Sequence, residues 1–115
     1  MLAMREPTFL YRAFLEAKGS PEVTSLIAYS MPHQEPLRAV VWHATREEWI
    51  YAPATAARLL FSDEYADESM EVDRMTAESM ARQYLQSELP SPEKLMEMSD
   101  EGIRMGWDYG PPPRE

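Results

Sequence analysis

The sequence predicts an α+β domain in which a small antiparallel sheet of three to four strands is followed by about three helices packed on one face. Three observations support this fold class. The first half of the chain contains segments rich in β-branched and aromatic residues, separated by turn residues. The second half carries apolar residues at helical spacing. With 115 residues, 44% of them hydrophobic, the chain can form one core.

Residues 8–16 and 23–30 form the first two predicted strands. In residues 8–16, large apolar side chains also recur four positions apart, so a short helix is an alternative. The aromatic content favours a strand. Turn residues at 18–22 separate the two segments, which indicates a hairpin.

Residues 37–44 form the best predicted strand, because apolar residues lie on both of its faces. This pattern indicates a central strand with something packed on at least one side. Next, Thr45 and Glu48 match a capping box that would open a helix. Residues 49–51 favour a strand, however, and Pro53 would interrupt such a helix. We therefore predict a turn and then a short strand.

The second half is predicted to be helical. Pro53 suits the first turn of a helix over residues 54–61, and residues 70–72 are expected to be a short extended segment. Residues 74–87 form the clearest amphipathic helix, with Asp73 or Thr76 as its cap. Its apolar stripe consists of Ala77, Met80, Ala81, Tyr84 and Leu85.

A last helix is predicted to start with Ser91 as N-cap and Pro92 at the first helical position. Its buried side is expected to include Leu95, Met98 and Ile103, while Gly102 either ends the helix or lets another backbone approach. We expect residues 1–109 to form a single compact domain. Residues 110–115 are predicted to be a flexible proline-rich tail.

The formal net charge of −9 is uneven along the chain. Residues 1–50 carry five basic and six acidic side chains, whereas residues 51–115 carry six basic and fourteen acidic ones. Such a charge disfavours direct binding to nucleic acid or to an anionic membrane, because like charges would meet. No apolar run has the length of a signal peptide or a membrane span. Together with the absence of cysteine, this favours a cytoplasmic protein. The arginine-rich, alanine-rich composition suggests a bacterial one.

The acids concentrate between the predicted helices, in residues 63–73. Three interpretations remain open: a solvated connection, a docking surface for a basic protein, and a calcium site. The stretch lacks the alternating Asp spacing and the glycine of a calcium loop. The candidate partner-binding acids are Asp63, Glu64, Asp67, Glu68, Glu71 and Asp73.

Trp49 and Tyr51 are candidate anchors for the same partner, because aromatic residues dominate the binding energy of interfaces. Trp42 lies close to them in sequence, and the alternative is that all three pack in the core. Trp49 follows two glutamates at a predicted turn, so its exposure would require a partner to cover it.

His33 and His43 are the two histidines of the chain, and no spacing signal places either beside a carboxylate or a nucleophile. The chain also lacks the usual zinc-protease, hydrolase and phosphate-loop motifs. We therefore assign no catalytic residue, no metal ligand and no cofactor.

These observations favour a small acidic module that docks on a basic protein and neutralises or chaperones it. Immunity proteins and antitoxins share this character of size and charge. One alternative is an inhibitor whose acids imitate nucleic acid. Another is an enzyme or small-ligand protein that uses His43 and a carboxylate in a pocket. The sequence does not predict an oligomeric state.

Overall fold

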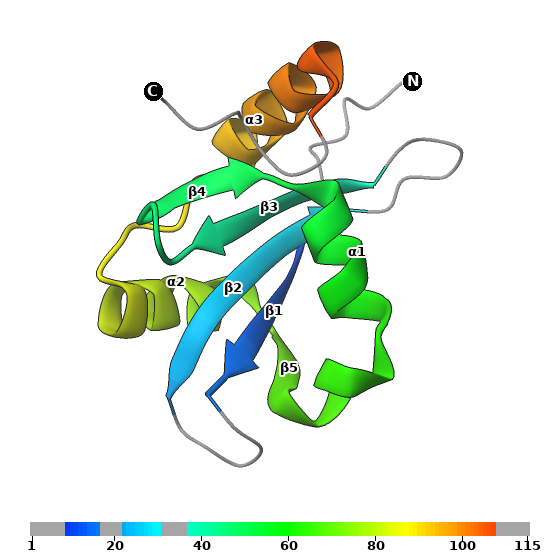
Figure 1. Ribbon diagram of the computed structural model, residues 1–115. Helices are drawn as coiled ribbons and strands as arrows, with labels where there is room; N and C mark the ends of the chain where they lie inside the picture. The colour runs from blue at the N-terminus through cyan, green and yellow to red at the C-terminus, as the bar shows by residue number, and fades with distance from the viewer. Residues whose placement is uncertain (1–8, 17–21, 31–36, 108–115) are drawn as a thin grey trace, which may run out of the picture.

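The computed structural model describes residues 9–16, 22–30 and 37–107, and Figure 1 shows their arrangement. The elements, in chain order, are β1 (Leu10–Leu15), β2 (Val23–Ser30), β3 (Arg38–His43), β4 (Glu48–Tyr51), α1 (Pro53–Phe61), a 3₁₀ segment (Asp63–Glu68), β5 (Ser69–Val72), α2 (Arg74–Met80), a π-helical turn (Ala81–Leu85) and α3 (Pro92–Met105). The predicted α+β class is therefore confirmed. His33 and the predicted tail 110–115 lie outside the described residues, as does most of the predicted turn at 18–22.

The sheet has five antiparallel strands in the order β4-β3-β2-β1-β5. The prediction of three to four strands was one strand short, because the segment expected to be extended at 70–72 pairs with β1. Tyr11 lies opposite Val72 in this pairing, and Phe14 lies opposite Ser69. The first four strands form a meander, and β5 returns to its far side. β4 and β5 are consequently the two edges of the sheet.

The helices cover both faces of this sheet, so the prediction that they pack on one face was wrong (Figure 1). α1 covers one face, where Ala56 packs with Ile27, Val41 and Ile50. α2, the π-helical turn and α3 cover the other face, where Ala77, Ala81 and Leu95 pack with strand residues. The physical reason is the composition of the central strands, which present apolar side chains on both sides and need two covers.

The helix starts agree with the sequence patterns. Pro53 and Pro92 each stand in the first turn of a helix, and the Ser91 hydroxyl accepts a hydrogen bond from the Lys94 N–H. The end of α3 differs from the expectation. α3 runs through Gly102 to Met105 and ends at Gly106, which has a φ of 73°.

Gly102 makes room for a side chain rather than for a backbone. A Cβ atom at this position would lie 1.8 Å from Cδ2 of Tyr51, whose ring packs on the glycine. Ile103 is 38% exposed and does not line the buried side of α3 as expected. The buried residues of α3 are Leu95, Ser99 and Gly102, and the predicted Met98 is half-buried and packs against the same core.

Candidate functional site

The predicted partner-binding acids lie on consecutive elements at the β5 edge of the sheet. We call residues 63–73 the acidic segment: it runs through the 3₁₀ segment and β5 to the residue that caps α2. The side chain of Glu64 lies outside the described part of the structure. Glu68 is half-buried, and the remaining acids are exposed: Asp63, Asp67, Glu71 and Asp73.

Asp73 and Glu71 also have contacts within the fold. The hydroxyl and the backbone N–H of Thr76 hydrogen-bond to Asp73 and lower the pKa of its carboxyl, and the N–H lies 2.7 Å from Oδ1. The Tyr29 hydroxyl donates to Glu71 over 3.5 Å. Burial first, and the charge of Glu71 second, raise the pKa of Tyr29. Both acids keep an exposed side chain beside these contacts.

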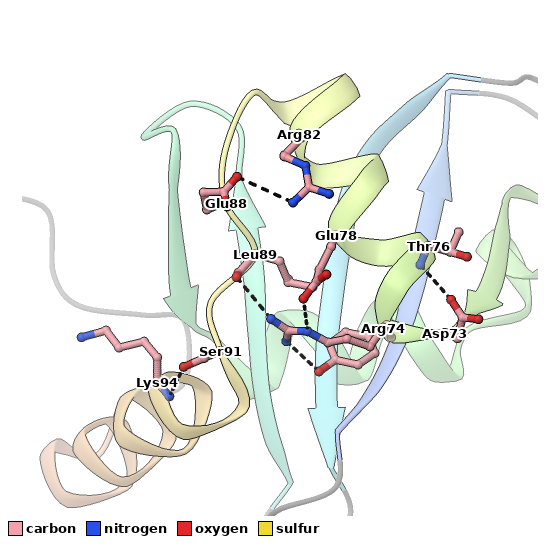
Figure 2. A network of polar contacts seen from close by, with 10 residues as sticks. Asp73, Arg74, Thr76, Glu78, Arg82, Glu88, Leu89, Ser91 and Lys94 are labelled. Atoms are coloured by element: carbon pink, nitrogen blue, oxygen red, sulfur yellow. Dashed lines mark hydrogen bonds and ion pairs between the residues drawn. The ribbon is translucent and has the colours of Figure 1, made fainter.

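Arg74 follows the acidic segment directly, but its positive charge is turned into the fold (Figure 2). Its guanidinium donates to Glu78 over 2.8 Å, to the Tyr11 hydroxyl over 2.9 Å and to the Leu89 carbonyl over 3.4 Å. The guanidinium also lies over the Tyr11 ring, 5.5 Å from its centroid. Desolvation lowers the pKa of Arg74, but the contacts with Tyr11 and Glu78 outweigh it and raise that pKa. Arg74 therefore binds β1, α2 and the segment before α3 together.

Trp49 and Tyr51 lie on β4, at the sheet edge opposite β5. The Trp49 ring packs edge-to-face against Trp42, with 5.2 Å between centroids, and its Nε1–H donates to the Ser87 hydroxyl over 3.1 Å. Tyr51 is only 4% exposed, and its hydroxyl donates to the Leu37 carbonyl. The structure therefore does not bring these two aromatic residues together with the acidic segment.

His43 lines a hollow of about 500 Å³ between α1 and the end of the β3–β4 hairpin. Its Nδ1 accepts a hydrogen bond from the backbone N–H of Arg46, so this nitrogen helps to hold the turn. Ser25 lines the same hollow, but its hydroxyl donates to the Trp42 carbonyl. No described carboxylate hydrogen-bonds to His43. The structure therefore contains the predicted hollow at His43 but not the predicted pair of histidine and carboxylate.

A second hollow lies at the opposite face of the same hairpin. We call it the hairpin hollow. Its volume is about 480 Å³, and its walls come from the start of β2, the 44–47 turn and the exit of the π-helical turn. The lining residues are Val23, Thr24, Trp42, Ala44, Glu47, Tyr84, Leu85, Gln86 and Ser87. No pattern in the sequence links these three segments.

Among the described residues, no three His, Cys, Asp or Glu side chains are grouped closely enough to hold a metal ion. In the same part of the chain, no helix combines the length and apolar character that a membrane crossing requires. No protein-family profile, no curated protein sequence and no solved structure shows a significant match to this chain. Any function must therefore be argued from the geometry of these surfaces.

Proposed function

We propose that this protein is an acidic binding module that docks on a basic protein through the acidic segment. The observation that carries this proposal is the exposure of four carboxylates, those of Asp63, Asp67, Glu71 and Asp73, along one edge of the sheet. A cluster of one charge sign on one side of a protein accelerates the encounter with a partner of opposite charge.

The neighbouring basic residue does not cancel this charge. Arg74 is held between Tyr11, Glu78 and Leu89, on the face of the sheet that α2 covers. Arg12 lies opposite Glu71 in the β1–β5 pairing and donates to the Ser69 hydroxyl, so one cation remains near the segment. The acids still outnumber it, and the surface stays negative.

The edge strand offers a second kind of contact. β5 pairs with β1 on one side, and no described strand pairs with its other side. The backbone groups on that side can bind an extended segment of a partner. Met70 is 45% exposed on β5 and supplies an apolar contact beside the acids. Charged edge residues also prevent pairing between copies, so the experiment must separate the two roles.

The test compares two variants with the same change in charge. One carries Asp63→Asn, Glu64→Gln, Asp67→Asn and Glu68→Gln in the acidic segment. The control carries Glu88→Gln, Glu93→Gln, Glu97→Gln and Glu101→Gln, all at exposed positions in or just before α3. A partner is first isolated from the native cell at low salt, and its dissociation constant for each protein is then measured by calorimetry.

We expect the acidic-segment variant to bind about tenfold or more weakly, because each exposed charge pair contributes roughly 0.2–1 kcal/mol. The control should change binding less than about threefold. Wild-type binding should weaken between about 50 mM and 500 mM salt. Equal binding at both salt concentrations, or by both variants, would refute the proposal. Aggregation of the acidic-segment variant without loss of binding would assign the acids to edge protection.

A further inference from the structure

We infer that the hairpin hollow is a binding site for a guanidinium group, carried either by a free small molecule or by an arginine side chain. This inference is independent of the proposed function, since the acidic segment follows the sheet edge at β5 and the hollow lies beside the turn that leads into β4. Either one can fail without the other.

The backbone around the hollow has a left-handed residue on each of two walls. Glu47 ends the 44–47 turn with a φ of 54°, and Gln86 follows the π-helical turn with the same φ. These are the non-glycine residues of positive φ among the described ones. Glycine is favoured at such positions, both at hairpin turns and after helices. Glu47 and Gln86 therefore place polar side chains on the hollow where glycine would be more stable.

Two polar side chains of the hollow have partners in the fold, because the Thr24 hydroxyl donates to the Phe14 carbonyl and the Ser87 hydroxyl accepts from Trp49. Three others have none among the described residues. The Glu47 carboxylate, the Gln86 amide and the Tyr84 hydroxyl all line it, and none makes a hydrogen bond or an ion pair there. The Glu47 neighbours differ in this respect, because Arg46 and Glu48 form an ion pair of 2.6 Å. The hollow thus presents a carboxylate and further acceptors that the fold itself does not use.

The aromatic wall of the hollow is fixed in place. Trp42 packs edge-to-face on Trp49, and the indole N–H of Trp49 donates to Ser87 at the exit of the π-helical turn. This contact joins the hairpin to the helical segment beside the hollow. Such a wall needs little reorganisation when a ligand binds, which lowers the cost of binding.

The chemistry of the lining selects a cation. It includes one carboxylate, that of Glu47, and no Lys or Arg side chain. Trp42 and Tyr84 line the hollow, and aromatic rings attract cations, guanidinium more readily than ammonium. Its five N–H donors match acceptors that are spread over two walls. A volume of about 480 Å³ suits a small molecule or a long side chain with part of its backbone.

The test uses tryptophan fluorescence and calorimetry with three probes. Agmatine represents a free small molecule, and N-acetyl-arginine methylamide represents an arginine in a peptide. N-acetyl-citrulline methylamide has nearly the same shape without the charge. We expect saturable binding of a guanidinium probe with a dissociation constant on the order of 1 mM. Tighter binding of agmatine indicates a small-molecule ligand, whereas tighter binding of the arginine derivative indicates a side chain of a partner.

Two variants connect this binding to the hollow. Glu47→Gln keeps the size of the side chain and should weaken binding roughly fivefold or more. Glu48→Gln removes the charge of the next residue, which lies on the face of β4 opposite to Trp49. This control should change binding less than about twofold. The inference is overturned if the citrulline derivative binds as tightly as the arginine derivative. It also fails if neither guanidinium probe gives saturable binding, or if Glu47→Gln has no effect.

Discussion

The two ends of the helical segment formed by residues 74–85 differ in whether their polar side chains have hydrogen-bond partners within the fold. At the first turn, Asp73 is hydrogen-bonded to Thr76, and Arg74 donates to Glu78 on the same helix and to groups on two other segments. At the last turn, the helix widens to a π-helical turn, and Gln86 leaves it in a left-handed conformation. The polar side chains beyond that turn face the hairpin hollow.

We interpret this difference as a division of roles along one helical segment, with one end contributing to stability and the other to binding. Polar groups that are partnered across elements stabilise a fold and specify its arrangement. A non-glycine residue in the left-handed region costs on the order of 1 kcal/mol, and irregular helical turns recur at functional sites. The first turn of the segment is therefore organised for folding. The last turn keeps unfavourable backbone conformations and polar groups available for a ligand.

The largest effect is expected at the first turn. Arg74→Met keeps the aliphatic stem but leaves the Tyr11 hydroxyl, the Leu89 carbonyl and the Glu78 carboxylate without the guanidinium. We expect the free energy of unfolding to fall by about 2–3 kcal/mol, measured by urea denaturation. Arg82→Met is the matched control, because its pair with Glu88 is long, at 3.9 Å, and exposed.

The control should change the stability by less than about 0.5 kcal/mol. Similar losses in both variants would mean that the first turn is not special, and the contrast between the two ends would disappear. A loss confined to Arg74→Met would establish Arg74 as the residue that holds β1, α2 and the connection to α3 together.

The opposite sign is expected at the two left-handed residues beside the hairpin hollow, Gln86 after the last turn and Glu47 in the hairpin. Glu47→Gly and Gln86→Gly should each raise the free energy of unfolding by about 0.5–1 kcal/mol, because glycine adopts a positive φ without strain. Both variants should also weaken the binding of N-acetyl-arginine methylamide. Gain of stability with loss of binding is the signature of a site kept at the expense of stability.

Gln83→Gly provides the control for the last turn. Gln83 lies within the π-helical turn, is exposed and does not line the hairpin hollow. Glycine inside a helical segment should cost about 1 kcal/mol and leave binding unchanged. If all three glycine variants lower the stability, the left-handed residues are not a source of strain.

The sequence predicted the first turn of this segment but not the last. A capping residue followed by an apolar stripe is a local signal, and Asp73 indeed caps α2. The hairpin hollow joins three segments, and its left-handed positions hold glutamate and glutamine instead of the glycine that would have marked them. A site assembled in this way leaves no local pattern.

The acidic segment illustrates the same limit for charge. Its acidic composition was visible in the sequence. Its place at the sheet edge depends on the pairing of β5 with β1, and no local sequence pattern predicts that pairing. Trp49 and Tyr51 were predicted to belong to the same binding surface because they lie near the acidic segment in the sequence. The sheet places them at the opposite edge instead.

The second apolar face of the central strands was also visible in the sequence. Which element covers this face could not be predicted, because the position of α1 depends on the path of the chain after β4.

The smallest effect is expected from the cap at Asp73, and it depends on pH. The bonds from Thr76 lower the pKa of this carboxyl below its ordinary value of 3.8. A lowered pKa in the folded state means that the contribution to stability is complete above the ordinary pKa. It is lost as the pH falls through the folded-state pKa. Asparagine caps a helix without titrating.

The stability of the wild type relative to Asp73→Asn should therefore be greater at about pH 6 than at about pH 3. Denaturation midpoints at the two pH values measure this change. Asp63→Asn removes a charge from the same acidic segment at the start of the 3₁₀ segment rather than at the N-cap of α2, so it corrects for general repulsion between the acids. A difference that is independent of pH, after this correction, would mean that the ionised carboxylate adds nothing to the cap. The contribution of the first turn to the free energy of unfolding would then come from Arg74 alone, and the contrast with the last turn would depend on that single guanidinium.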